Sequence, residues 1–158
     1  MIFPTVHGTS LSGRKYVVPF GLEGEYNVVL IAFEPSHQFQ LQTWLAPLER
    51  LKETYARFRY YQLPVLWSYA EDQRAMIDES MRRAIPGTSM QEIIITLYAD
   101  KQVFCDLLDL QGEAHIYVLL IDHEGEVLWR TERGATREKI DSLTSMLDEL
   151  CRTDSTTA

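Results

Sequence analysis

The stretch Tyr26-Asn-Val-Val-Leu-Ile-Ala-Phe33 decides the fold. It is β-branched and almost wholly apolar, which is typical of a strand covered on both faces, as in a central parallel sheet. Pro35 and Ser36 end this strand, and Pro47 is expected to kink the helix that follows. Apolar residues recur there at helical spacing, at Leu41, Trp44, Leu45, Leu48, Leu51, Tyr55 and Phe58. We therefore expect a buried central strand followed by a kinked helix.

The rest of the chain alternates between strand and helix patterns before it changes character. We expect a strand at 58–65, a helix at 70–84, a strand at 92–98 and a short helix through 103–108. Each helix pattern follows a strand pattern. This order indicates an α/β protein with a sheet flanked by helices.

Two strand patterns near the C-terminus, at 115–121 and 126–130, flank the turn-forming segment Asp122-His-Glu-Gly125. Such a segment predicts an antiparallel hairpin. A closing helix is expected at 135–150, with Thr136 as its N-cap and an apolar stripe on one face.

Composition bounds the class of protein. The 158 residues carry 15 Lys and Arg against 23 Asp and Glu, a net charge of −8, which is enough chain for one domain with a real core. Because nucleic acids and anionic membranes attract through dense Lys and Arg, neither is expected as a partner. The longest apolar runs have six residues, so no membrane span is predicted. The first residues show no export-signal pattern, and a cytoplasmic location is expected.

Three segments are distinguished along the chain. Residues 1–25 are rich in Gly and Pro around one strand candidate at 15–18, which predicts an N-terminal arm with a short strand. Residues 26–151 form the main domain. Residues 152–158 are polar and are expected to be a disordered tail.

The two cysteines, Cys105 and Cys151, form no CxxC pair and no Cys/His cluster. Metal and dithiol signatures are therefore missing. The glycine-rich stretches lack a phosphate-cradle motif, so no nucleotide or other cofactor is expected.

Two motifs resemble the thioredoxin superfamily. Trp44-Leu-Ala-Pro-Leu-Glu-Arg-Leu51 looks like the kinked first helix of thioredoxins. Leu120-Ile-Asp-His-Glu-Gly-Glu-Val127 resembles the strand, turn and strand of the thiol-disulfide and peroxiredoxin branches. The resemblance implies a thioredoxin-like α/β fold, with a central mixed sheet flanked by helices, a C-terminal hairpin and a closing helix.

The redox features that the resemblance would bring are absent. In thioredoxins an Ala-Pro follows the second active-site cysteine by five positions, and here the two cysteine positions hold Phe39 and Gln42. The slot for the cis-proline before the hairpin falls at Ile116, within one residue. A cis bond before a non-proline residue costs about 3 kcal/mol, so a trans bond is expected there.

The segments Gly125-Glu-Val-Leu-Trp129 and Gly134-Ala-Thr136 look most like the thioredoxin-like domain of mitochondrial ATP synthase assembly factors and their bacterial relatives. That family lacks a regular CxxC and acts by protein contact. The resemblance implies a chaperone-like, assembly or scaffold role.

A site is expected where the loop before the kinked helix meets the loop before the hairpin. His37 and Glu113 could there act as a general acid/base pair, or Ser36 could simply cap the helix while His37 stays solvated. Trp67 and Tyr69 would flank this edge as an exposed aromatic pair. The candidate binding residues are Ser36, His37, Phe39, Gln42, Glu113, His115, Ile116, Trp67 and Tyr69.

Three functions remain open at this point. The first is a redox-inactive protein that binds a protein partner or a second copy of itself through this edge, with Phe39 and Ile116 offering apolar contact. The second is a thiol- or histidine-dependent enzyme on the same fold that uses Cys105, or His37 with His115. The third is a sensor of a small ligand.

Overall fold

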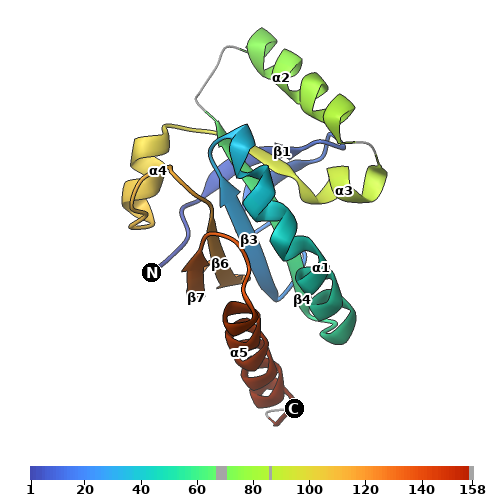
Figure 1. Ribbon diagram of the computed structural model, residues 1–158, viewed down its shortest axis with the longest axis vertical. Coiled ribbons are helices and arrows are strands. Elements are labelled where there is room, and N and C mark those ends of the chain that lie inside the picture. The colour runs from blue at the N-terminus through green and yellow to red at the C-terminus, as the bar shows by residue number, and fades with distance from the viewer. Residues whose placement is uncertain (67–70, 86, 157–158) are drawn as a thin grey trace.

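The computed structural model describes residues 1–66, 71–85 and 87–156, and within them seven strands form one mixed sheet in the order β2-β1-β5-β4-β3-β6-β7. The strands are β1 (Val6–Ser10), β2 (Lys15–Val18), β3 (Tyr26–Ala32), β4 (Phe58–Leu66), β5 (Ile95–Tyr98), β6 (Tyr117–Asp122) and β7 (Val127–Glu132). The helices are the 3-10 turn η1 (Pro35–His37), α1 (Gln38–Thr54), α2 (Glu71–Ala84), α3 (Thr88–Ile93), α4 (Lys101–Leu107) and α5 (Arg137–Thr156). Figure 1 shows α2 at one end of the molecule and α5 at the other.

β3 is the central strand that the sequence predicts. It pairs in parallel with β4 and antiparallel with β6, and all of its residues are buried. Because neighbouring side chains on a strand point to opposite faces, Val28 and Leu30 join the apolar cluster on one face of the sheet, and Val29 and Ile31 join the cluster on the other. β3 thus belongs to both cores.

Helices α1 and α5 cover one face of the sheet. Trp44 is fully buried there between the two helices and the strands, and its Nε1 donates a hydrogen bond to the Arg133 carbonyl at 2.9 Å. Its ring meets that of Trp129 edge to face at 6.5 Å. The predicted first helix is confirmed, with Pro47 inside it.

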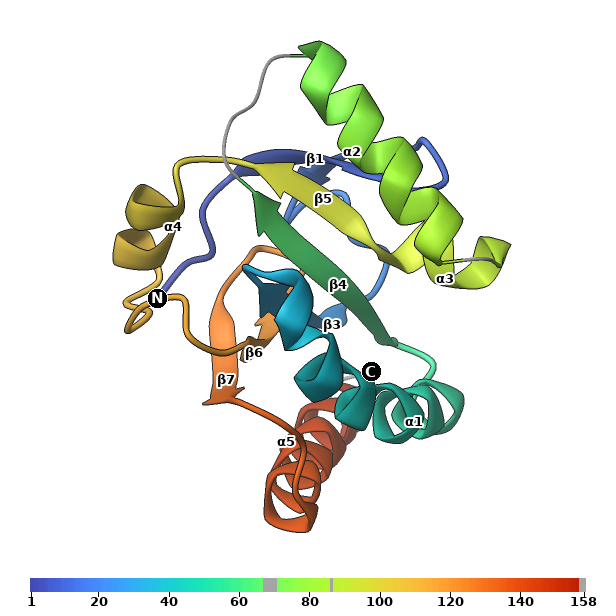
Figure 2. The ribbon, with the colours of Figure 1, turned by 45° about the horizontal axis from the view of Figure 1, so that its top comes forward.

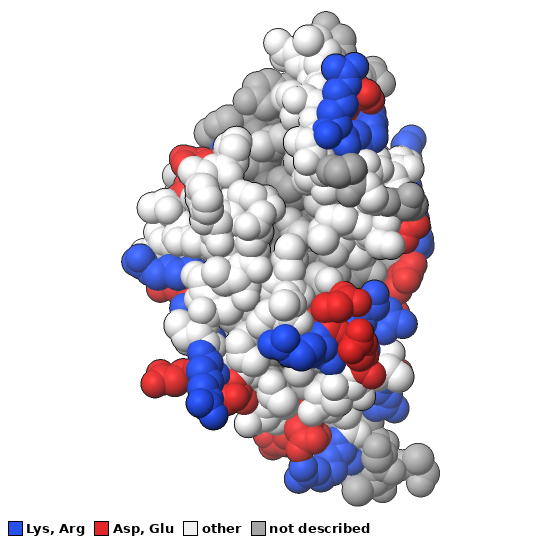
Figure 3. Space-filling model, turned by 45° about the vertical axis from the view of Figure 1, so that its right-hand side comes forward, with Lys and Arg blue, Asp and Glu red and all other residues white. Residues whose placement is uncertain are grey.

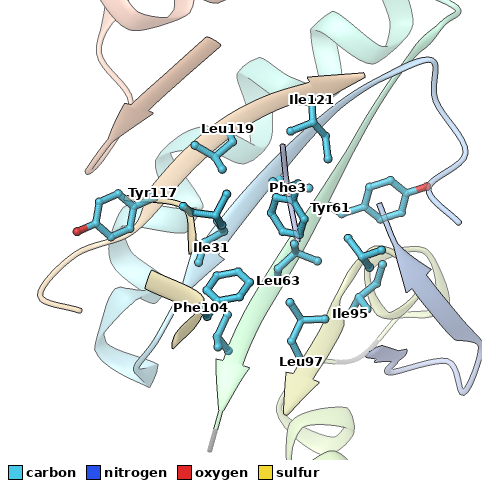
Figure 4. Packing of buried hydrophobic residues seen from close by; sticks show 14 of the residues in the cluster. Phe3, Ile31, Tyr61, Leu63, Ile95, Leu97, Phe104, Tyr117, Leu119 and Ile121 are labelled. Carbon is cyan, nitrogen blue, oxygen red and sulfur yellow. The ribbon is translucent and has the colours of Figure 1, made fainter. Parts of the chain in front are cut away.

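The N-terminal residues and α4 cover the opposite face (Figures 2 and 4). The Phe3 ring packs against Phe104 of α4 at 5.8 Å and is 1% exposed. The Phe3 N–H donates to the Gly125 carbonyl at 2.8 Å, so the first residues pair with the C-terminal hairpin. The chain start is therefore part of the core.

The expected N-terminal arm with one short strand is wrong in this respect. The structure has two strands there, and β1 joins the sheet beside β5. The apolar pattern did not predict β1, because the residue at its centre is Gly8. A Cβ at this position would come within 2.6 Å of the Ile95 side chain. Close packing against β5 demands a glycine, and a glycine breaks the apolar pattern that marks a strand.

The C-terminal hairpin is confirmed. β6 and β7 pair antiparallel, and Asp122 Oδ1 accepts hydrogen bonds from the N–H groups of Glu124 and Glu126 at 2.9 Å each. Gly125 completes the turn with a φ of +91°, which favours glycine.

Two element boundaries differ from expectation. The apolar run predicted as a strand at 92–98 begins as the end of α3, and only Ile95–Tyr98 is a strand. Helix α5 continues to Thr156, so the predicted disordered tail at 152–158 begins inside a helix. Arg152 pairs with Asp148 one turn earlier, and no Gly or Pro follows Leu150 to end the helix.

No helix among the described residues is long and apolar enough to cross a membrane.

We predict that Phe3→Ala lowers the free energy of unfolding by about 3 kcal/mol or more, because a buried aromatic side chain is removed from the core. Ile2→Ala is the matched control, since Ile2 is 58% exposed and should change stability by less than about 0.5 kcal/mol. Urea unfolding followed by circular dichroism measures both. Equal stability of the two variants would show that the chain start does not belong to the core.

Candidate functional site

The predicted edge exists at the carboxyl ends of β3 and β4. Turn η1 and the first residues of α1 follow β3 there, and the loop at 112–116 leads into β6 beside them (Figure 2). In open α/β sheets, ligands bind outside the carboxyl ends of the strands, at a point such as this one.

His37 is buried at this edge, with 4% of its surface exposed. Its Nδ1 accepts a hydrogen bond from the Phe33 N–H at 3.1 Å, and its Nε2 has no hydrogen-bond partner among the described residues. Burial lowers the pKa of His37; Lys101 and His115 act in the same direction, while Glu34 and the Ala114 backbone oppose them. The expectation of a solvated His37 ring is therefore wrong.

Lys101 takes the partner that was expected for His37. Its Nζ donates to the Phe33 carbonyl at 3.0 Å and lies 3.6 Å from Glu113 Oε1. The side chain is nine-tenths buried, so the cation needs both the carbonyl and the carboxylate to offset its desolvation. Sequence reasoning missed this residue; the only signal was a lysine just after the Asp100 cap of α4.

His115 and the loop around it are fixed to the sheet. His115 Nε2 lies 2.5 Å from Glu132 Oε2 at the end of β7, and its ring lies 4.8 Å from that of Tyr117. The Tyr117 hydroxyl donates to the Gly112 carbonyl at 2.8 Å. The loop is therefore a preformed surface, closed on one side by β7.

Ile116 joins the core instead of the surface. It is fully buried with the α1 and α5 cluster, and its N–H donates to Gln40 Oε1 at 3.1 Å. The expectation that it offers apolar contact to a partner is wrong, because the loop turns inward there to begin β6. The expected trans bond before Ile116 is confirmed, since the cis bond among the described residues is Val18–Pro19.

Phe39 is the most exposed large apolar side chain described, at 82%. Ser36 and Gln42 are also exposed beside it, and the Ser36 hydroxyl donates to Glu34 at 3.3 Å instead of capping α1. Residues 35–48 contain no Lys, Arg, Asp or Glu. Figure 3, which brings the side of the molecule with α1 forward, shows a wide uncharged area above a group of charged side chains. The predicted aromatic flank, Trp67 and Tyr69, lies outside the described residues.

The cysteines offer no reactive thiol at this edge. Cys105 is a buried residue of α4, 3% exposed, and burial, with Glu113 and Asp106, raises its pKa against the opposing effect of Lys101. A thiol that stays protonated is a poor nucleophile. Cys151 lies half-buried in α5. The described residues hold no group of three metal-ligating side chains.

Comparison with known proteins gives structural matches only. No protein-family model matches the sequence, and no curated protein matches it. Copper-bound yeast Sco1 has a TM-score of 0.61 at 16% identity, over 93% of this chain and 92% of that one. The fold is thioredoxin-like. The exposed lipoprotein thioredoxin Etrx1 of Streptococcus pneumoniae has a TM-score of 0.58 at 12% identity, over 92% and 99% of the two chains. A putative thiol:disulfide interchange protein DsbE of Chlorobium tepidum has a TM-score of 0.53 at 14% identity, over 92% of each of the two chains.

These identities show the thioredoxin-like fold and nothing finer. The fold class expected from the sequence is confirmed, including the mixed sheet, the hairpin and the closing helix. The finer likeness to ATP synthase assembly factors has no counterpart among these neighbours.

We predict that His37 titrates below the ordinary histidine pKa of about 6.5, because its burial disfavours the imidazolium. The unfolded chain then takes up the proton first as the pH falls. Stability contributed by the neutral ring is complete above about pH 6.5 and is lost as the pH drops below it.

Carbon-detected NMR of the imidazole gives the pKa, and urea unfolding between neutral and acid pH gives the stability. The variant His37→Asn, whose Oδ1 can still accept the Phe33 N–H, should show a weaker fall in stability over this range. A midpoint at or above the ordinary value would mean that His37 is charged, and that its environment is wrongly described.

Proposed function

We propose that this chain is a redox-inactive thioredoxin-fold protein that binds another protein through the edge formed by η1, the first turns of α1 and the loop at 112–116. The observation that carries the proposal is Phe39. An aromatic side chain that is 82% exposed stands where a redox relative would have a cysteine.

The chemistry of the edge supports binding over redox turnover. The second cysteine position holds Gln42, an exposed amide with no redox chemistry, and the nearest free thiol is the buried Cys105. A disulfide exchange needs a thiolate that a substrate can reach. The described part of this edge supplies none.

The mechanics of the edge also favour a partner. The Phe33 backbone is held by His37 on one side and by Lys101 on the other, and Gln40 holds the 112–116 loop to α1. A surface that is rigid before binding loses little entropy when it binds. Aromatic anchors in the middle of uncharged surface are the residues that carry most of the energy in protein interfaces.

The partner's identity is the finer part of the proposal. The resemblance of residues 125–136 to assembly factors supports an assembly or scaffold role. A second copy of the chain is the other partner that Phe39 could serve, and the experiment below separates the two.

A histidine-dependent enzyme is the second candidate, and one observation favours it: His37 Nε2 is neutral and unpartnered among the described residues. Because Nδ1 accepts the Phe33 N–H, the neutral ring carries its proton on Nε2, which can therefore donate a hydrogen bond or a proton but not accept one. Because the ring is only 4% exposed, a substrate reaches it only if the loop at 112–116 moves, which makes this the weaker of the two functions.

We predict that Phe39→Asp abolishes partner binding while the fold stays intact. Losing a central aromatic anchor typically costs 2 kcal/mol or more, about thirtyfold in affinity, whereas a surface change alters stability by less than about 0.5 kcal/mol. Phe20→Asp is the matched control, because Phe20 is also exposed, at 61%, and lies outside this edge.

The immobilised proteins are exposed to lysate of the native cell and the bound proteins are quantified, with circular dichroism to verify folding. Light scattering reports self-association of each variant. The edge is the binding site if a protein, or the second copy, is retained by the wild type and Phe20→Asp and lost from Phe39→Asp. If well-folded Phe39→Asp keeps every partner, the proposal fails.

We predict further that the purified protein neither reduces insulin disulfides nor consumes peroxide with added thiols. Burial raises the pKa of Cys105 and keeps its thiol protonated, and Cys151 lies in α5. The double variant Cys105→Ser, Cys151→Ser sets the background rate. Turnover clearly above that background would establish a thiol-dependent enzyme in place of a binding protein.

A further inference from the structure

A hollow lies beside α2, against the strands β1 and β2 that the N-terminal segment adds to the sheet. It is away from the edge formed by η1, the first turns of α1 and the loop at 112–116, which we call the Phe39 edge. Its volume is about 410 Å³, within the range of small-molecule sites. Figure 2 shows α2 running along β1 and β5 on this side. The residues that line it are His7, Gly8, Thr9, Lys15, Tyr16, Val17, Arg74, Thr96 and Tyr98.

The strand register explains why polar side chains gather there. Thr9 of β1 stands opposite both Lys15 of β2 and Thr96 of β5, and His7 stands opposite Val17. Residues that are paired across adjacent strands point to the same face of the sheet, so these residues form one surface. The alternate residues, including Tyr16 and Leu97, belong to the core on the other face.

The Thr96 hydroxyl marks this hollow as an incomplete site. Thr96 is 1% exposed, and its Oγ1 has no hydrogen-bond partner among the described residues. Buried polar groups in native proteins are nearly always hydrogen-bonded, and an exception calls for a missing partner. A hydroxyl that lines a cavity can take that partner from a ligand.

The charge of the lining points to the kind of ligand. Two lining side chains, Lys15 and Arg74, are cations and none is acidic, in a chain with a net charge of −8, although Arg74 already has an interaction of its own. The Arg74 guanidinium lies 4.9 Å from the centre of the Tyr98 ring. Among the described side chains, Asp78 is an acidic group close to the hollow, and it accepts a hydrogen bond from the Tyr98 hydroxyl at 3.0 Å.

A neighbouring hollow of about 290 Å³ offers a contrast. It also contains arginines, but Arg14 pairs there with Glu23 at 2.6 Å, and the Tyr61 hydroxyl accepts the Glu23 N–H at 3.1 Å. Arg14, Glu23 and Tyr61 are therefore already partnered within this hollow. The hollow beside α2 differs from it in having no acid in the lining and in the unpartnered Thr96 hydroxyl.

We propose that the hollow beside α2 binds a small organic molecule through an oxyanion, a phosphate monoester or a carboxylate. The Lys15 ammonium and the Thr96 hydroxyl donate to its oxygens, since an ammonium is purely a donor and the hydroxyl has its proton to give. The side chains of Val17 and Tyr98 provide the wall for the organic part. This site is separate from the Phe39 edge and does not depend on the function proposed for it.

The test titrates the full chain with phenyl phosphate, benzoate and phenol, followed by amide NMR. Phenyl phosphate or benzoate should shift the amides of Gly8, Lys15 and Thr96, and phenol, which lacks the charge, should not. Whichever of the two anions binds more tightly identifies the oxyanion as a phosphate or a carboxylate.

Three variants locate the binding. Lys15→Gln and Thr96→Val should each weaken the anion about fivefold or more, while Lys52→Gln, which removes the same charge from the neighbouring hollow, should change it by less than twofold. Thr96→Val should not lower the melting temperature, because its hydroxyl has no structural partner to lose among the described residues.

Absence of binding by both anions at millimolar concentration overturns the proposal. Equal weakening by Lys15→Gln and Lys52→Gln, or full affinity in Thr96→Val, does so as well, since either result would mean that the anion binds elsewhere.

Discussion

The burial of β3 on both faces is the constraint on which the rest of the structure depends. A strand that is apolar throughout must be covered twice, so α1 and α5 pack on one side, and Phe3 and α4 pack on the other. The same strand delivers the chain to Phe33, where the backbone leaves the sheet. Turn η1 and the first residues of α1, including Phe39, follow directly from that point.

Polar side chains hold the backbone of the Phe39 edge in place. His37 and Lys101 both bind the backbone of Phe33, one by accepting its N–H and the other by donating to its carbonyl. Lys101 also holds Glu113, so the loop before β6 is tied to α4. Polar groups that could have served chemistry are used to fix shape, and Phe39 is left exposed on a fixed support.

The N-terminal strands add a second surface on their outer face, while Tyr16 and Val18 of β2 complete the core on the inner face. Gly8 lets β1 approach β5 closely, and this brings Thr9 and Lys15 into line with Thr96 on the outer face. The two surfaces lie at different parts of the sheet. The protein contact and the small-ligand site that we propose therefore share no residues.

The sequence by itself determined the elements whose residues are read locally: the central strand at Tyr26–Ala32, the helix through Pro47 and the hairpin around Gly125. Apolar periodicity and turn residues act over a few positions, and these signals survive in any context. Phe39 and the missing CxxC were likewise visible, because they are a matter of which residue stands at a motif position.

Only the tertiary structure decided the partners. Lys101 lies 68 positions from Phe33, and His115 lies 17 positions from Glu132, so nothing local predicts either contact. Ile116 was expected at the surface and is buried, because burial depends on what packs over a residue. β1 was not predicted for the same reason. Gly8 is explained only by β5, which packs against it and lies far away in the chain.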